Sequence, residues 1–110
     1  MEHKMKLKNE PFNMMKNGKK DIEMRLYDEK RQQIKPKDTI EFTNIITNET
    51  IKYLVKDLHV YKSFEQIYQI FDKERLGYLT NEKAHYKDME QYYPIDEIKK
   101  YGVVGIELIK

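Results

Sequence analysis

The amino-acid sequence predicts an α+β fold, built as a small mixed β-barrel surrounded by short helices. Segments in which apolar and polar residues alternate, as in strands, occur at both ends of the chain and in three places between them. The helical segments are short and lack the regular strand–helix–strand repeat of a parallel α/β sheet. Because the first and last elements are both strands, we expect them to pair and close the sheet.

The chain begins with a strand at residues 3–8, followed by a short helix capped by Asn9 or Glu10. Pro11 suits the first turn of a helix. Gly18 suits the left-handed conformation that often ends one. The next strand therefore emerges directly from the end of this helix.

The middle of the chain predicts a β-hairpin. A polar loop at residues 27–33 leads into a turn at Pro36–Asp38. A strand at residues 39–46 and a turn at residues 47–49 follow, and residues 50–61 return as a long strand. Both alternating sets of this long strand are partly apolar, so we expect it to be covered on two sides or to carry a bulge.

The second half begins with a helix in which Ser63 and Gln66 have the spacing of a capping box. Apolar residues at helical spacing predict one buried face, formed by Phe64, Ile67, Tyr68 and Phe71. A further helix is predicted over residues 81–92, with one face formed by His85, Met89 and Tyr92.

Pro94 begins the last short helix, which ends at Gly102 and turns three residues inward: Ile95, Ile98 and Tyr101. Residues 103–109 then close the chain as a strand. On one side of this strand lie Val104, Ile106 and Leu108, and Gly105 thins the other side.

Composition indicates one domain over residues 1–110 that needs no disulfide or thiolate–metal site, because cysteine is absent. The N-terminus has no apolar run fit for a signal peptide, and no stretch reaches the length of a membrane span, so we expect a cytoplasmic protein. Residues 1–37 carry 11 Lys/Arg and 6 Asp/Glu (+5), and the remainder carry 10 and 13 (−3), which sum to the net +2. This basic N-terminal segment is compatible with a phosphate-bearing ligand or with an ordinary solvated surface.

The densest chemistry lies in the strand after Gly18. Ile22, Met24 and Leu26 alternate on one face of this strand, so Glu23 and Arg25 lie side by side on the other. Two interpretations remain open: a polar recess that binds a ligand, with Lys20 at its mouth, or an ion pair that only stabilises the strand.

The segment from His85 to Tyr93 is rich in aromatic rings. Tyr86, Tyr92 and Tyr93 are candidates to stack on a nucleic-acid base. Alternatively, Tyr92 and Met89 are core contacts and the rest is a solvated face. We predict no cofactor and no metal site.

The run Gly18 to Arg25 reads G-x-K-x-x-E-x-R and resembles the signature of ASCH domains, relatives of the PUA RNA-binding domain. The flanking helix, the turn around Lys37 and the last strand also resemble the small single-domain bacterial members; Lys37 stands where many relatives have glycine. The resemblance implies a PUA-like barrel with a cleft lined by the motif, and a ligand that is RNA or nucleotide-like.

Some relatives of this size are amidohydrolases that deacetylate acetylcytidine with a lysine, a threonine and a glutamate. The resemblance places the lysine at Lys20 and the glutamate near Glu90. The threonine position is Glu23, which has no hydroxyl.

Three functions therefore follow from the sequence. The first is an RNA- or nucleotide-binding domain with a floor of Lys20, Glu23 and Arg25 and a facing wall of Glu90 with one or more of Tyr86, Tyr92 and Tyr93. The second is an amidohydrolase acting on a modified nucleoside through Lys20, Glu23 and Glu90. The third is a protein-interaction module. The oligomeric state has no signal in the sequence.

Overall fold

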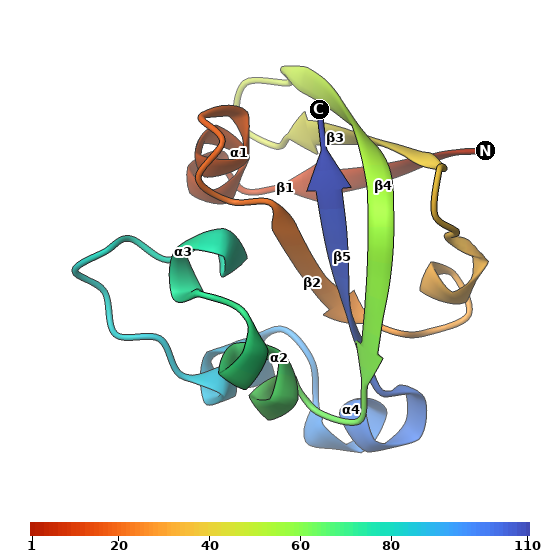
Figure 1. The fold of residues 1–110 in the computed structure, drawn as a ribbon, viewed down its shortest axis with the longest axis vertical. Coiled ribbons are helices and arrows are strands. Elements are labelled where there is room, and N and C mark those ends of the chain that lie inside the picture. Colours follow the sequence, from red (N-terminus) through yellow and green to blue (C-terminus); the bar gives the residue numbers. More distant parts are fainter.

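One five-stranded sheet carries the fold of the computed structural model, which describes residues 1–110. The strands are β1 (Glu2–Leu7), β2 (Ile22–Leu26), β3 (Thr39–Asn44), β4 (Thr50–Tyr61) and β5 (Val103–Ile109). The helices are α1 (Asn9–Lys16), α2 (Phe64–Ile70), α3 (Lys73–Leu76) and α4 (Ile95–Tyr101), with the 3₁₀ helices η1 (Arg31–Gln33) and η2 (Tyr86–Gln91). The sheet curls into a half-barrel with short helices around it (Figure 1), which confirms the predicted α+β class.

The strand order β1-β3-β4-β5-β2 shows that the expected pairing of the first and last strands is wrong. β1 pairs only with β3, in parallel, whereas β5 lies between β4 and β2. The long β4 is the reason, because its first part pairs with β3 and its second part pairs with β5. β4 therefore occupies one edge of β5 and β2 occupies the other, which leaves no edge for β1. The barrel therefore stays open between its two edge strands, β1 and β2.

The predicted bulge in β4 is confirmed, because the pairing with β5 shifts register between Val55 and Asp57. The bulge lies where β4 changes its partner strand. The sheet as a whole packs into two hydrophobic cores. One core joins β1, β3, β4 and β5 to α1. The other joins β2 to α2, α3, η2 and α4.

The two faces of β5 show how the sequence brings these cores together. Val104, Ile106 and Leu108 face the first core, as the alternation in β5 predicts. On the opposite face, a Cβ added to Gly105 would lie 3.3 Å from Ile22 Cγ2 and 3.6 Å from Ile67 Cδ1. The absence of a side chain at Gly105 therefore lets α2 and β2 approach β5.

Several local predictions need correction. Residues 81–92 do not form one helix: only η2 is helical, and the segment before it is irregular. Of the face predicted there, Met89 is buried, but His85 and Tyr92 are exposed. η2 begins where it does because His85 and Asp88 cap it reciprocally.

Two helix caps also differ from the prediction. Ser63 is the N-cap of α2 but makes no side-chain cap, and Gln66 accepts a hydrogen bond from the backbone of Lys62 rather than of Ser63, so the predicted capping box does not form. Lys8, rather than Asn9 or Glu10, is the N-cap of α1.

In α4, Ile98 is buried and Tyr101 is partly buried, but Ile95 is exposed and does not face the core as predicted. The longest helix, α1, has eight residues, and no helix of the structure is long and apolar enough to cross a bilayer.

Candidate functional site

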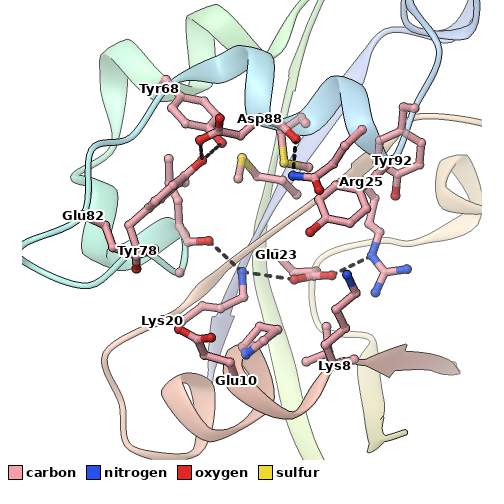
Figure 2. A pocket seen from close by; sticks show the side chains of 18 of the residues that line it. Lys8, Glu10, Lys20, Glu23, Arg25, Tyr68, Tyr78, Glu82, Asp88 and Tyr92 are labelled. Atoms are coloured by element: carbon pink, nitrogen blue, oxygen red, sulfur yellow. Dashed lines mark hydrogen bonds and ion pairs between the residues drawn. The ribbon is translucent and has the colours of Figure 1, made fainter.

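A cavity of about 670 Å³ lies on the open side of the half-barrel (Figure 2). Its walls come from β1 and the start of α1, from β2 and the residues before it, and from the α2–α3 and η2 regions. This volume falls in the range of small-molecule sites in proteins. The gap between the two edge strands is thus a shaped pocket with helical segments as its far wall.

The floor of the cavity holds a buried ion network. Lys20 Nζ lies 3.1 Å from Glu23 Oε1, and Arg25 Nε lies 2.6 Å from Glu23 Oε2. The side chains of Lys20 and Glu23 are only 4% and 7% exposed. The alternation in β2 explains the arrangement, because Ile22, Met24 and Leu26 enter the core and leave the charged residues to the cavity side.

Lys20 has no hydrogen-bond donor to spare. Its Nζ donates to the carbonyl oxygens of Ile22 (2.7 Å) and Leu76 (3.0 Å) in addition to contacting Glu23. An ammonium group has three N–H donors, and all three are engaged. Lys20 therefore ties β2 to the end of α3 and is not a free contact for an anion.

Arg25 connects the two edges of the open barrel. Its Nη2 donates to the carbonyl oxygen of Lys6 on β1 at 3.0 Å, while its Nε binds Glu23 on its own strand. The planar guanidinium allows both contacts at once. A side chain therefore bridges β1 and β2, which no backbone hydrogen bond joins.

The carboxylate of Glu23 is held in its ionised form. Burial raises its pKa, but the charges of Lys20 and Arg25 outweigh burial, so the pKa of Glu23 lies below its ordinary value. Each carboxylate oxygen has two lone-pair directions, and one cation occupies one on each oxygen. The remaining acceptor capacity is available to a donor in the cavity.

The far wall carries a chain of hydroxyl groups that ends at a carboxylate. The hydroxyl of Tyr78 donates to Asp88 Oδ2 at 2.7 Å, so Tyr68, also 2.7 Å away, must donate its proton to Tyr78. Burial raises the pKa of Tyr68 to about 12, and burial together with the contacts to Tyr68 and Asp88 raises the pKa of Tyr78. Both phenols are therefore neutral near pH 7 and present fixed polar groups.

Aromatic rings line the cavity beside Arg25. Tyr93 stacks on Phe64 with ring centroids 6.0 Å apart, which fixes its orientation. Tyr92 is half exposed at the mouth, and Lys8 Nζ lies 5.0 Å from the centre of its ring. The mouth thus combines a half-exposed aromatic ring with a cation that lies over it.

The structure brings five of the seven predicted site residues to this cavity: Lys20, Glu23, Arg25, Tyr92 and Tyr93. The predicted placement of Glu90 on the facing wall is wrong, and of the three tyrosines offered for that wall Tyr86 does not line the cavity. Glu90 is exposed and lies outside the cavity, because the short 3₁₀ turn buries Met89 and directs its neighbour outward. Tyr86 lies on the other side of the α2–α3 segment, where it lines a smaller hollow with His85.

Sequence reasoning missed two further groups of cavity residues. Lys6, Lys8 and Glu10 come from β1 and α1, and Tyr68, Tyr78 and Asp88 come from the far wall. The basic alternation of the first strand was a signal for the lysines. Nothing in the linear sequence indicates which wall faces the motif.

The side chains that line the cavity offer several groups for polar recognition. No group of three or more His, Asp or Glu side chains is arranged to hold a metal ion. The cavity instead offers a buried carboxylate acceptor, oriented phenols and flat rings. Such a set can bind the edge and the face of a heterocyclic base.

Comparison with known proteins supports one family. The ASCH domain model matches residues 5–110. The crystal structure of hypothetical protein PH0355 is 40% identical, with a TM-score of 0.84 over 98% of this chain and 97% of that one. The solution NMR structure of protein PF0455 from Pyrococcus furiosus is 39% identical, with a TM-score of 0.75 over 98% and 96% of the two chains. The curated proteins contain no match. The chain is a member of the ASCH domain family.

Proposed function

We propose that this ASCH domain binds RNA or a nucleotide-like ligand in the cavity between β1, β2 and the helices. The observation that carries the proposal is the buried carboxylate of Glu23, held ionised by Lys20 and Arg25 on the cavity floor. The family membership adds support, since ASCH domains are often linked to RNA binding.

Stability alone gives a weak reason for this network. Well-packed apolar residues in place of a buried ion pair are often as stable or more stable, because the charges lose their hydration. Charged groups with perturbed pKa values in a cleft are typical of functional sites instead. We therefore infer that Glu23 is buried in order to hold a preorganised hydrogen-bond acceptor in the cavity, and not to stabilise the fold.

A base fits the remaining features. The free acceptor capacity of Glu23 suits the N–H groups on a base edge, as when a carboxylate accepts from the amino group of cytosine. Tyr92 offers a ring for stacking, a contact that contributes about 1–3 kcal/mol per base. The neutral phenols of Tyr68 and Tyr78 add acceptor oxygens on the opposite wall, since both of their protons are donated along the chain that ends at Asp88.

The test is calorimetric titration of the protein with the four ribonucleosides, their monophosphates and a short single-stranded RNA. We expect binding by at least one of these, and loss of it in Glu23→Gln measured where the variant is folded. Glu90→Gln is the matched control and should bind like the wild type, because Glu90 lies outside the cavity. Equal affinity for wild type and Glu23→Gln, with only stability reduced, would favour a structural network in an interaction module.

We do not propose amide hydrolysis. The donors of Lys20 are all engaged, Glu90 lies outside the cavity, and position 23 supplies no hydroxyl. The three groups that the related deacetylases use are therefore not assembled. Release of cytidine from acetylcytidine by the wild type, lost in Lys20→Ala, would contradict this reasoning.

A further inference from the structure

Three lysines lie at alternate positions along β1 and the extended residue that follows it: Lys4 and Lys6 on the outward face of β1, and Lys8 at the N-cap of α1. They point outward because Met5 and Leu7 turn into the core. Lys6 and Lys8 line the cavity, whereas Lys4 does not. The strand thus brings two cations to the mouth and leaves a third, chemically identical one outside it.

These two lysines are the uncommitted cations of the cavity. Neither ammonium group takes part in a salt bridge or a hydrogen bond; Lys6 meets the ion network only through its backbone carbonyl, which accepts from Arg25, and the carbonyl of Lys8 accepts from the backbone of Phe12. By contrast, Lys20 and Arg25 are both paired with Glu23. An anionic group entering the cavity therefore finds the unpaired cations at Lys6 and Lys8, not on the motif strand, where both cations are paired with Glu23.

The position of Lys8 links this charge to the aromatic wall. Its Nζ lies 5.0 Å from the centre of the Tyr92 ring, and a cation–π contact at an exposed ring is weak. A base that stacks on Tyr92 can displace the ammonium group at little cost. The released Lys8 then stays beside the ring, within reach of the substituents of the stacked nucleoside.

Charge is unevenly distributed along the cavity. Four basic and four acidic side chains line it: Lys6, Lys8, Lys20 and Arg25 against Glu10, Glu23, Glu82 and Asp88. The total is therefore near zero and does not favour a highly charged anion. Figure 2 shows Lys8 on the same side as Arg25 and Tyr92, with Glu82 and Tyr78 at the opposite side.

We propose that the cavity takes a nucleoside unit with a single phosphate group, with the base inside against Tyr92 and Glu23 and the phosphate at the mouth between Lys6 and Lys8. This inference rests on the proposed function and specifies its ligand class. The phosphate belongs either to a free nucleoside monophosphate or to the backbone of an RNA strand. Additional phosphates gain nothing, because the mouth offers two free cations and the acidic residues repel the rest.

The test compares each nucleoside with its 5′-monophosphate, its 3′-monophosphate and its 5′-triphosphate by calorimetric titration, and adds a short single-stranded RNA. For the base that binds best, we expect a monophosphate to bind about tenfold more tightly than the nucleoside and a triphosphate no more tightly than the monophosphate. Tighter binding of the RNA than of either monophosphate would identify the backbone as the source of the phosphate. The reverse order would identify the free nucleotide.

Three alanine variants locate the phosphate. Lys6→Ala and Lys8→Ala should each remove most of the tenfold preference for the monophosphate over the nucleoside, which is measured as the ratio of the two affinities within each variant. Lys6→Ala keeps the backbone carbonyl that binds Arg25, so the floor stays intact. Lys4→Ala removes the same charge from the same strand face outside the cavity and should have no effect. If RNA binds, each cavity variant should also lower the slope of log affinity against log salt by about one unit or slightly less.

The outcomes separate this inference from the proposed function. Nucleosides that bind as tightly as their monophosphates, or a loss in Lys4→Ala equal to that in Lys8→Ala, would overturn the phosphate assignment and leave base binding standing. No binding of any nucleoside, nucleotide or RNA would overturn both.

Discussion

Replacing Glu23 with glutamine tests the energetics of the cavity floor most directly. The substitution keeps the shape of the side chain and removes its charge. Lys20 and Arg25 then face each other without a counterion, in a place where the side chain at position 23 is 7% exposed. Lys20 retains two carbonyl acceptors and Arg25 retains one, so each cation keeps part of its hydrogen bonding.

The expected loss follows from these contacts. Removing one partner of a buried ion pair costs about 3–5 kcal/mol, because the remaining charge is left uncompensated. The surviving carbonyl contacts and the amide oxygen of glutamine place Glu23→Gln at the lower end, at about 3 kcal/mol. For a domain of this size, such a loss lowers Tm by roughly 12 °C or more.

Urea denaturation followed by circular dichroism measures this difference, and its pH dependence identifies the carboxylate as the cause. The pKa of Glu23 is lower in the folded protein than its reference value of 4.5. Its stabilising contribution is therefore complete above about pH 4.5 and is lost as the pH falls through the folded pKa. The difference between wild type and Glu23→Gln should shrink over that acidic range.

A loss below about 0.5 kcal/mol, or a difference that does not change with acid, would refute the reasoning, because it would mean that water screens the network as it screens a surface pair.

A triple variant, Lys20→Met with Glu23→Leu and Arg25→Met, completes the test. It should recover much of the stability lost in Glu23→Gln but should not bind the ligand, since apolar packing replaces the charges without supplying an acceptor.

Three further substitutions test separate features. Asp38 accepts hydrogen bonds from His3 and the backbone of Lys35, which lower its pKa from 3.8 to about 2. In acid denaturation, the stability difference between wild type and Asp38→Asn should therefore be present above pH 3.8 and disappear toward about pH 2. Lys37 has φ +78°, so Lys37→Gly should stabilise the domain by up to about 1 kcal/mol in urea denaturation. In Gly77→Ala, the new Cβ would lie 3.2 Å from Lys20 Cδ, and residue 77 has φ +113°. The free energy of unfolding should therefore fall by about 2 kcal/mol or more in the same assay. The loss should be smaller in the control Gly18→Ala, where φ is +80° but no atom lies within 4 Å of the new Cβ.

Local alternation was enough to predict most of the strands. The bulge in β4 was foreseeable because both faces of this strand are partly apolar, and the structure explains this pattern by the change of partner at the bulge. The pairing of β1 was not foreseeable, because its alternation specifies which face is buried and not which strand lies alongside. Closure depends on the length of β4, whose second half occupies the edge of β5.

The candidate site was predictable to the extent that it lies on one strand. The spacing of Glu23 and Arg25 predicts their common side, and the structure places both on the cavity floor. The opposite wall comes from an irregular segment, where a 3₁₀ turn and not an α-helix decides which side chains face inward. The predicted helix over this segment therefore placed Glu90 in the site, where it does not lie, and did not identify Asp88, which does line the cavity.

The open edge of the barrel accounts for the division of labour among the basic residues. Carbonyl groups on β1 and β2 lack a facing strand there, and such edge groups need partners. Arg25 supplies a donor to Lys6, and Lys20 supplies donors to Ile22 and Leu76. These cations hold the walls in place, and their charge in turn requires the buried Glu23 beside them. The donors of Lys20, the lysine of the motif, are thus all used to hold the cavity walls together. An anionic group of the ligand must therefore bind to Lys6 and Lys8, which lie outside the motif.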